Sequence, residues 1–173
     1  PGALGAALAC PEKPVLCLNC DGGMMMNLQE AHTIVENNLP IKLIIFNNDG
    51  YLMIKHTQKM LFKGSYTSVN KNTGIGLPSF KDLMPSFGYK YFEMKDWRNS
   101  DELLEEFLNS EGAACLEVYM DPEQDFVPKV KGVVREDGTI FAPPIEEMSP
   151  LLSLDTMQKE MVSLSEKSKQ IKR

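Results

Sequence analysis

Apolar runs alternate with amphipathic segments along the first 120 residues. A short, continuously apolar run at 15–19 predicts a strand, and mainly apolar stretches at 41–46, 89–94 and 113–120 predict three more. Apolar positions at helical spacing between Asn27 and Asn38 predict a helix that Pro40 ends, and similar patterns predict helices at 79–88 and 99–110. Strands that alternate with helices indicate an α/β fold with a doubly wound, mainly parallel sheet and helices on both faces.

The character of the chain changes at residue 121. From there the sequence is rich in proline and charge, and it ends in a polar stretch near 154–171 that is compatible with a helix. We therefore expect a domain at 1–120 and a C-terminal extension at 121–173 that wraps around it. At the other end, residues 2–9 are small and helix-compatible.

Composition narrows the class of protein. The chain has 173 residues, 43% of them hydrophobic, which is enough for one buried core. A net charge of -6 argues against a nucleic-acid surface, which is normally basic. No apolar run reaches the roughly 18 residues of a membrane span, and the N-terminus lacks a basic leader. These features predict a cytoplasmic protein with no nucleic-acid or membrane partner.

The four cysteines include one C-x-x-C pair, Cys17 and Cys20, which raises the alternatives of a zinc site or a redox pair. No second pair follows, and neither histidine stands at metal-ligand spacing from it. We interpret Cys10, Cys17, Cys20 and Cys115 as buried or half-buried thiols, and we expect Cys17 and Cys20 to hold neither zinc nor a disulfide.

Polar residues follow the first two predicted strands. Asp21 stands just past the first and Asn48 just past the second, and parallel strands bring such positions to the same sheet edge, where α/β sheets bind ligands. Between them, Gly22 and Gly23 open a helix, whose N-terminal N–H groups stabilise anions. Carboxylate and amide oxygens suit Mg²⁺. The pattern predicts a metal-bridged diphosphate site, although Asp-Gly-Gly and Asn-Asn-Asp-Gly taken singly are also ordinary turn sequences.

Taken together, Asp-Gly, 25 residues and then Asn-Asn resemble the thiamine diphosphate (ThDP) motif G-D-G-x(about 25 to 30)-N-N. The sequence "MNLQE...IVENNLPIKLIIFNNDGYLMI" is similar to the acetolactate synthase-like branch of ThDP enzymes, and the likeness extends from Gly2 to about Pro150. One departure is plain: Cys20 stands where the motif has its first glycine. That position shapes the turn in the family and does not bind the metal.

The resemblance implies a role for each motif residue. Asp21, the side chain of Asn48 and the main-chain carbonyl of Gly50 would bind Mg²⁺. The backbone of Gly22 and Gly23 would hold the diphosphate, and the segment Gly50, Tyr51 and Leu52 would close over it. Met53 would face the substrate side of the cofactor, although it could equally be an ordinary core methionine.

Other positions give weaker evidence of a function. Met24, Met25 and Met26 are expected to pack at the start of the helix, and Glu30 is expected to be structural. His56 is more compatible with a surface or loop residue than with a proton shuttle, and the Gly-Ile-Gly at 74–76 reads as a loop because no strand precedes it.

The resemblance also implies partners. In such enzymes the activating glutamate lies in a separate pyrimidine-binding domain, usually of a partner subunit, and this chain looks like the C-terminal diphosphate-binding domain, truncated at its start. The implied parent is a homodimeric or homotetrameric carboligase or decarboxylase of a 2-keto acid such as pyruvate. The tail resembles relatives linked to modified-sugar synthesis, which suggests a sugar acceptor. The alternative is a non-catalytic module that stabilises an oligomer.

Overall fold

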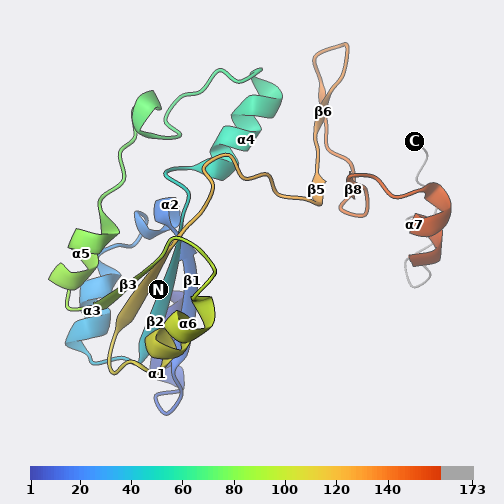
Figure 1. Cartoon of the computed structure of the whole chain (residues 1–173). Helices are drawn as coiled ribbons and strands as arrows, with labels where there is room; N and C mark the ends of the chain where they lie inside the picture. The colour runs from blue at the N-terminus through green and yellow to red at the C-terminus, as the bar shows by residue number, and fades with distance from the viewer. Residues whose placement is uncertain (161–173) are drawn as a thin grey trace. The chain divides into compact units, whose positions relative to one another are not determined.

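The computed structural model describes residues 1–160, and the chain divides into two compact units, Pro1–Gln124 and a second that begins at Asp125. The first unit contains a four-stranded parallel sheet (Figure 1). Its strands are β1 (Val15–Cys20), β2 (Ile41–Asn47), β3 (Lys90–Met94) and β4 (Ala114–Tyr119), in the spatial order β1-β2-β4-β3. This confirms the α/β class and the parallel sheet, with each strand within two residues of its predicted bounds.

Helices cover the sheet on both faces. On one face, α3 (Glu30–Glu36) and α5 (Phe80–Ser86) pack with Leu43, Ile45 and Cys115 of the sheet. On the other face, α6 (Ser100–Asn109) packs over Ile44 and Leu116, and the rings of Phe92 and Phe107 meet edge to face with their centroids 5.7 Å apart. The two cores hold the strand ends, and therefore the polar residues that follow them, at one edge.

Lys42 is buried in the second core although it carries a charge. Its ammonium donates hydrogen bonds to the Ser110 and Gly112 carbonyls and to the Ser110 hydroxyl, just past the end of α6. Burial, and then the charge of Lys90, lower the pKa of Lys42. The side chain satisfies carbonyls that the end of α6 leaves unpaired, so we assign it a structural role.

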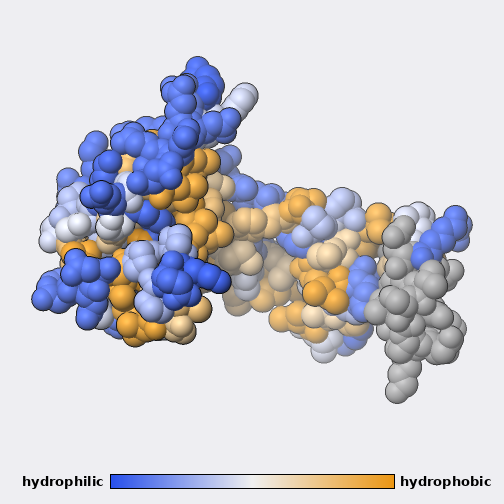
Figure 2. Space-filling view, turned by 90° about the horizontal axis from the view of Figure 1, so that it is seen from below, coloured by the Kyte–Doolittle hydropathy of each residue, from blue (hydrophilic) through white to orange (hydrophobic). Residues whose placement is uncertain are grey.

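The first strand departs from its prediction. An apolar run suggests burial on both faces, but β1 is an edge strand whose residues alternate between half-buried and exposed, and Leu16 and Leu18 are 50% and 62% exposed. Cys10 and Cys20 are exposed as well, so their prediction as buried or half-buried thiols was wrong, whereas Cys17 is half-buried and Cys115 buried. Hydrophobic side chains also reach the surface elsewhere in the molecule (Figure 2).

The helix predicted between 27 and 38 is shorter and is preceded by a separate turn of helix. The chain forms α2 (Asp21–Met24), then turns whose amides bond three residues back, such as Asn27 N to Met24 O at 3.3 Å, and only then α3. Three helices complete the unit: α1 (Gly2–Ala9), α4 (Leu52–Leu61) and the 3-10 helix η1 (Lys71–Thr73). The first matches the small-residue run, and α4 was not predicted.

The second unit contains short antiparallel pairs. Strand β5 (Lys129–Val130) pairs with β8 (Met148–Ser149), and β6 (Val133–Val134) pairs with β7 (Ile140–Phe141). Helix α7 (Leu154–Glu160) begins where a polar helix was expected, and the rest of that predicted stretch, to 171, lies outside the described residues. Among residues 1–160, no helix has the length and apolar character needed to cross a membrane.

Candidate functional site

Asp21 is the centre of the candidate site. Its side chain is fully buried directly after β1 and accepts three backbone hydrogen bonds, from Gly22 N to Oδ1 at 2.7 Å and from Asn48 N and Gly50 N to Oδ2 at 3.0 Å each. Burial raises the pKa of this carboxyl, and the hydrogen bonds from Gly50, Gly22 and Asn48 oppose that shift. A carboxylate in such a place is stabilised by a cation beside it.

The loop after β2 is held by its backbone amides. Asn48 and Gly50 donate to Asp21, and the amide between them, that of Asp49, donates to Oδ1 of Asn47 at 2.9 Å. Three consecutive N–H groups are therefore fixed by two side chains, one at the start of α2 and one at the end of β2. The expected convergence of residues 21 and 48, which lie 27 positions apart in sequence, is present in the structure.

Asn48 carries the site's unsatisfied polar atom. Its side-chain oxygen Oδ1 is buried and has no hydrogen-bond partner. A buried carbonyl oxygen without a partner costs about 1–3 kcal/mol, so such atoms are rare unless a ligand or water completes them. A hard cation at this oxygen would remove that cost, and the residues present therefore fit a Mg²⁺ ion.

The glycines after Asp21 lie close to neighbouring side chains, which would have to move if a Cβ were added. A Cβ on Gly22 would lie 2.8 Å from two ring atoms of Tyr51, and one on Gly23 would lie 2.4 Å from Oδ1 of Asn19. Cys20, which replaces the motif's first glycine, has φ -120°, an extended backbone that any residue adopts. The substitution therefore leaves the turn's backbone without strain.

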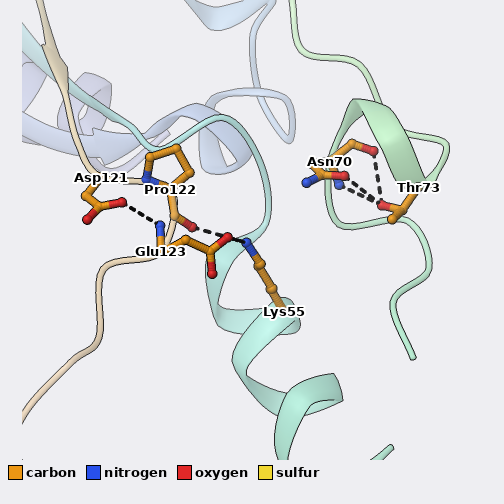
Figure 3. A network of polar contacts seen from close by, with 6 residues as sticks. All are labelled: Lys55, Asn70, Thr73, Asp121, Pro122 and Glu123. Carbon is orange, nitrogen blue, oxygen red and sulfur yellow. Dashed lines mark hydrogen bonds and ion pairs between the residues drawn. The ribbon is translucent and has the colours of Figure 1, made fainter. Parts of the chain in front are cut away.

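Gly50 is fixed by the segment that carries Val69. Its φ is +146°, and a Cβ there would lie 2.1 Å from the Val69 carbonyl oxygen, which also accepts a hydrogen bond from Tyr51 N at 2.8 Å. The Val69 segment is closed by a capping box in which Asn70 and Thr73 bond reciprocally (Figure 3). The Gly50 carbonyl, the third predicted metal oxygen, is therefore on a backbone with little freedom.

Replacing Gly50 with alanine is expected to lower the free energy of unfolding by at least about 3 kcal/mol, because the new Cβ would meet backbone rather than a flexible side chain. The matched control is Gly112→Ala, where φ is +68° but no atom lies within 4 Å of the new Cβ. We expect the control to lose only about 1–2 kcal/mol, the cost of a left-handed residue. Urea unfolding of both variants measures the difference, and equal losses would contradict the steric argument.

The remaining residues discussed as site candidates lie on helix α4. Leu52, its first residue, is 5% exposed and packs inward, whereas Met53 is 64% exposed, so it is not the core methionine of the alternative reading. His56 is half-buried on the same helix, not in a loop. Lys55 connects α4 to the segment after β4, since its ammonium donates to the Pro122 carbonyl at 3.4 Å and pairs with the Glu123 carboxylate (Figure 3).

The donor set limits which ions the site can hold. Within residues 1–160, no group of three or more His, Cys, Asp or Glu side chains could hold a metal ion. The candidate site instead offers one carboxylate, one amide oxygen and one backbone carbonyl, from Asp21, Asn48 and Gly50. Mg²⁺ requires about six oxygens, so phosphate oxygens and water must supply the rest. A site of this kind fits a metal together with a diphosphate better than a metal alone.

The fold and this site define a cofactor-binding domain of the α/β type, and comparison with known proteins identifies its family. Residues 1–118 match the model of the thiamine pyrophosphate enzyme C-terminal TPP binding domain, thiamine pyrophosphate being another name for ThDP. The chain therefore belongs to the ThDP enzyme family, as the motif predicted.

Proteins of similar sequence support the same family assignment. The chain is 36% identical over 132 residues to acetolactate synthase isozyme 1 large subunit of Escherichia coli, and 35% identical over 122 residues to a probable acetolactate synthase large subunit of Methanococcus aeolicus. These matches cover 75% and 70% of this chain but only 23% and 20% of the relatives, so the chain spans less than a quarter of their length. The domain is thus acetolactate synthase-like.

A solved structure supports the fold. The Rhodococcus jostii ThDP-dependent 4-hydroxybenzoylformate decarboxylase aligns with a TM-score of 0.62 at 23% identity, covering 72% of this chain and 23% of that one. At this identity the likeness speaks for the fold alone.

Sequence reasoning missed the residues that support the site. Asn47 and Glu117 are hydrogen-bonded to each other from β2 and β4, and Val69 buttresses Gly50. A signal for Glu117 was present, because a single acidic residue stands inside the apolar run "AACLEVYM". A charge at such a position is buried and must be hydrogen-bonded.

Proposed function

We propose that this domain binds the diphosphate of ThDP through Mg²⁺, with Asp21, the side chain of Asn48 and the carbonyl of Gly50 as protein ligands. The observation that carries the proposal is the buried, unpartnered Oδ1 of Asn48, next to a loop that the Asp21 carboxylate holds. The backbone of Gly22 and Gly23 is proposed to hold the diphosphate, because a residue without a Cβ lets a phosphate approach the backbone N–H groups closely.

We also propose the activity of the full-length protein: a ThDP- and Mg²⁺-dependent carboligase or decarboxylase of a 2-keto acid such as pyruvate. When bound, ThDP supplies the electron sink that allows a bond next to a carbonyl to break or form. The residues of this chain hold the diphosphate and orient the cofactor, and exposed Met53 on α4 is proposed to contact the substrate. We propose an activated sugar as the acceptor, because the C-terminal extension from residue 121 resembles that of relatives linked to modified-sugar synthesis.

This activity requires a pyrimidine-binding domain in the same or a partner subunit, and we propose a homodimer or homotetramer. The second candidate is a non-catalytic module with a structural role. Two features favoured it, the departure of Cys20 from the motif and the absence of an assigned pyrimidine-binding half-site. The ordinary backbone at Cys20 weakens the first of these arguments.

Binding of ThDP and Mg²⁺ to the 173-residue chain tests the cofactor site. We expect heat of binding, and shifts of the Gly22 and Gly50 amide resonances in ¹H–¹⁵N spectra, when both are added, and hardly any change with either alone, because the protein offers too few oxygens to Mg²⁺. Asn48→Ala should abolish the joint binding. Its stability without ligand should stay within about 0.5 kcal/mol of wild type or rise, because the lost oxygen has no partner.

The matched control is Asn37→Ala, which removes an asparagine that bonds to the Thr33 carbonyl at the end of α3, away from the site. It should bind as wild type does. No Mg²⁺-dependent binding by the wild-type chain would favour the non-catalytic module.

A further inference from the structure

Glu117 is a buried carboxylate near the candidate site. It lies in β4, between β2 and β3, where it is 2% exposed and stands opposite Ile45 and Glu93 in the two adjacent strands. Burying an ionised carboxylate is costly unless hydrogen bonds compensate. The structure supplies two such bonds, one to each carboxylate oxygen: Asn47 donates through Nδ2 to Oε1, and Tyr91 donates through its hydroxyl to Oε2.

These bonds determine how the amide of Asn47 is oriented. An ionised carboxylate only accepts hydrogen bonds, so Asn47 must present its NH₂ to Glu117 and its oxygen to the other side. That oxygen accepts the Asp49 amide at 2.9 Å. Were the amide reversed, two oxygens would face each other at Glu117, and two N–H donors would face each other at Asp49.

The Asp49 amide is the middle one of the three that fix the loop after β2. Asp49 has φ +61°, a left-handed conformation that is unfavourable for a residue with a side chain and therefore needs support. The amides on either side, of Asn48 and Gly50, donate to Asp21, and the Asp49 amide also opposes the rise that burial causes in the pKa of the Asp21 carboxyl. Asn47 thus completes the support of the segment whose oxygens we assign to Mg²⁺.

The carboxylate of Glu93, in the adjacent strand, differs from that of Glu117 in its exposure and its partners. Glu93 stands at the same register in β3, yet its side chain is 32% exposed and pairs with Lys95 at 3.1 Å. It therefore contacts surface lysines, while Glu117 contacts the residue that precedes Asn48. Burial and partners, not charge alone, set Glu117 apart.

We propose that Glu117 is a positioning residue for the cofactor site: through Asn47 it fixes the loop that presents Asn48 and Gly50 to the Mg²⁺–diphosphate group. This inference rests on the proposed function. Glu117 need not touch the metal or the cofactor, because outer hydrogen-bonding partners that orient metal ligands typically contribute 10- to 100-fold to metal affinity.

The test compares two replacements of Glu117 by calorimetric titration of ThDP in the presence of Mg²⁺. Glu117→Leu frees the Asn47 amide and should weaken binding about 10- to 100-fold. Glu117→Gln can still accept from Asn47 through its oxygen, while the Tyr91 hydroxyl turns to accept from its NH₂, so its affinity should stay within about threefold of wild type. Glu93→Gln is the control, and its affinity should also stay within about threefold of wild type, because Glu93 pairs with Lys95 and not with Asn47.

A readout without ligand separates positioning from stability. Hydrogen exchange of the Asp49 amide should accelerate in Glu117→Leu and in Asn47→Ala, and stay near the wild-type rate in Glu117→Gln and Glu93→Gln. Asn47→Ala should lose as much affinity as Glu117→Leu, and it keeps the test available if the leucine variant does not fold.

The outcomes are distinct. If the wild-type chain binds ThDP with Mg²⁺, and Glu117→Leu or Asn47→Ala binds with the same affinity, the positioning role is overturned and the proposed function stands. An equal loss in Glu117→Gln and Glu117→Leu would show that the charge matters and not the amide orientation, which also overturns the inference. No Mg²⁺-dependent binding by wild type would remove the proposed function and this inference with it.

Discussion

Replacing Asp21 with alanine is expected to abolish Mg²⁺-dependent ThDP binding, with a loss of affinity above the roughly 100-fold that marks the upper range for outer-shell residues. Two effects combine in this variant. It removes the carboxylate that we propose as a metal ligand, and it leaves the amides of Gly22, Asn48 and Gly50 without their acceptor. The loop that carries Asn48 would then lose the bonds of its Asn48 and Gly50 amides to the first residue of α2.

The control for this variant is Asp121→Ala. Asp121 is an exposed carboxylate after β4 that accepts the Glu123 amide, so its loss removes the same charge from the same unit without touching the Asp21 network. Titration of each variant with ThDP and Mg²⁺ should show binding for Asp121→Ala and none for Asp21→Ala. Wild-type affinity in Asp21→Ala would remove the assignment of the metal site.

Folding of the two variants must be compared before binding is interpreted. Each buried amide left without a partner costs about 1–3 kcal/mol, so Asp21→Ala should unfold at lower urea concentration than wild type. A further variant, Asp21→Asn, keeps a side-chain oxygen that accepts hydrogen bonds. It should therefore be more stable than Asp21→Ala. It still lacks the negative charge, so its Mg²⁺-dependent binding should remain weak.

The approach of Asp21 to Asn48 could be predicted from sequence because it follows from topology alone. Two apolar runs joined by a helix form a right-handed unit, and both polar residues then lie at the carboxyl edge of the sheet. The structure has this arrangement, with Asp21 bonded to the Asn48 amide. The roles in cofactor and metal binding stay predictions, since they rest on the family motif.

The partners of the supporting residues could not be predicted because their contacts join distant parts of the chain. Glu117 and Asn47 are 70 positions apart and meet only because β2 and β4 are neighbours, although β3 lies between them in sequence. The same holds for the Val69 carbonyl, which approaches Gly50 from a segment with no regular pattern. Hydrophobic periodicity reports which face of an element is buried, not which strand is adjacent.

The misjudged helices and strand have local causes. Residues 25–29 form turns in place of a continuous helix, because Met26 bonds to Gly23 and Glu30 to Asn27, three residues back. An apolar run also cannot distinguish a central strand from an edge strand, so the exposure of Leu16 and Leu18 was not foreseen. These positions are covered only if another element packs on that face of β1.

The isolated 173-residue chain is expected to have no decarboxylase or carboligase activity at saturating ThDP and Mg²⁺. Within the described residues, the proposed cofactor site consists of backbone amides and the proposed metal ligands, and we assign no acidic residue there to the aminopyrimidine end of the cofactor. The resemblance places that activating glutamate in a pyrimidine-binding domain. Loss of one positioned proton-transfer group lowers a rate by about 10²- to 10⁴-fold, and we propose that this group lies outside the 173 residues.

The decisive measurement is pyruvate consumption by the isolated chain and by the full-length protein at equal concentration, with the full-length Asp21→Ala variant as the control for cofactor loss. The full-length protein should turn over, and the other two should not. The chain should nevertheless bind ThDP and Mg²⁺, because its ligands lie within one unit with its own buried core. Turnover by the isolated chain at the full-length rate would place the proton-transfer groups among its own residues and would refute the half-site assignment.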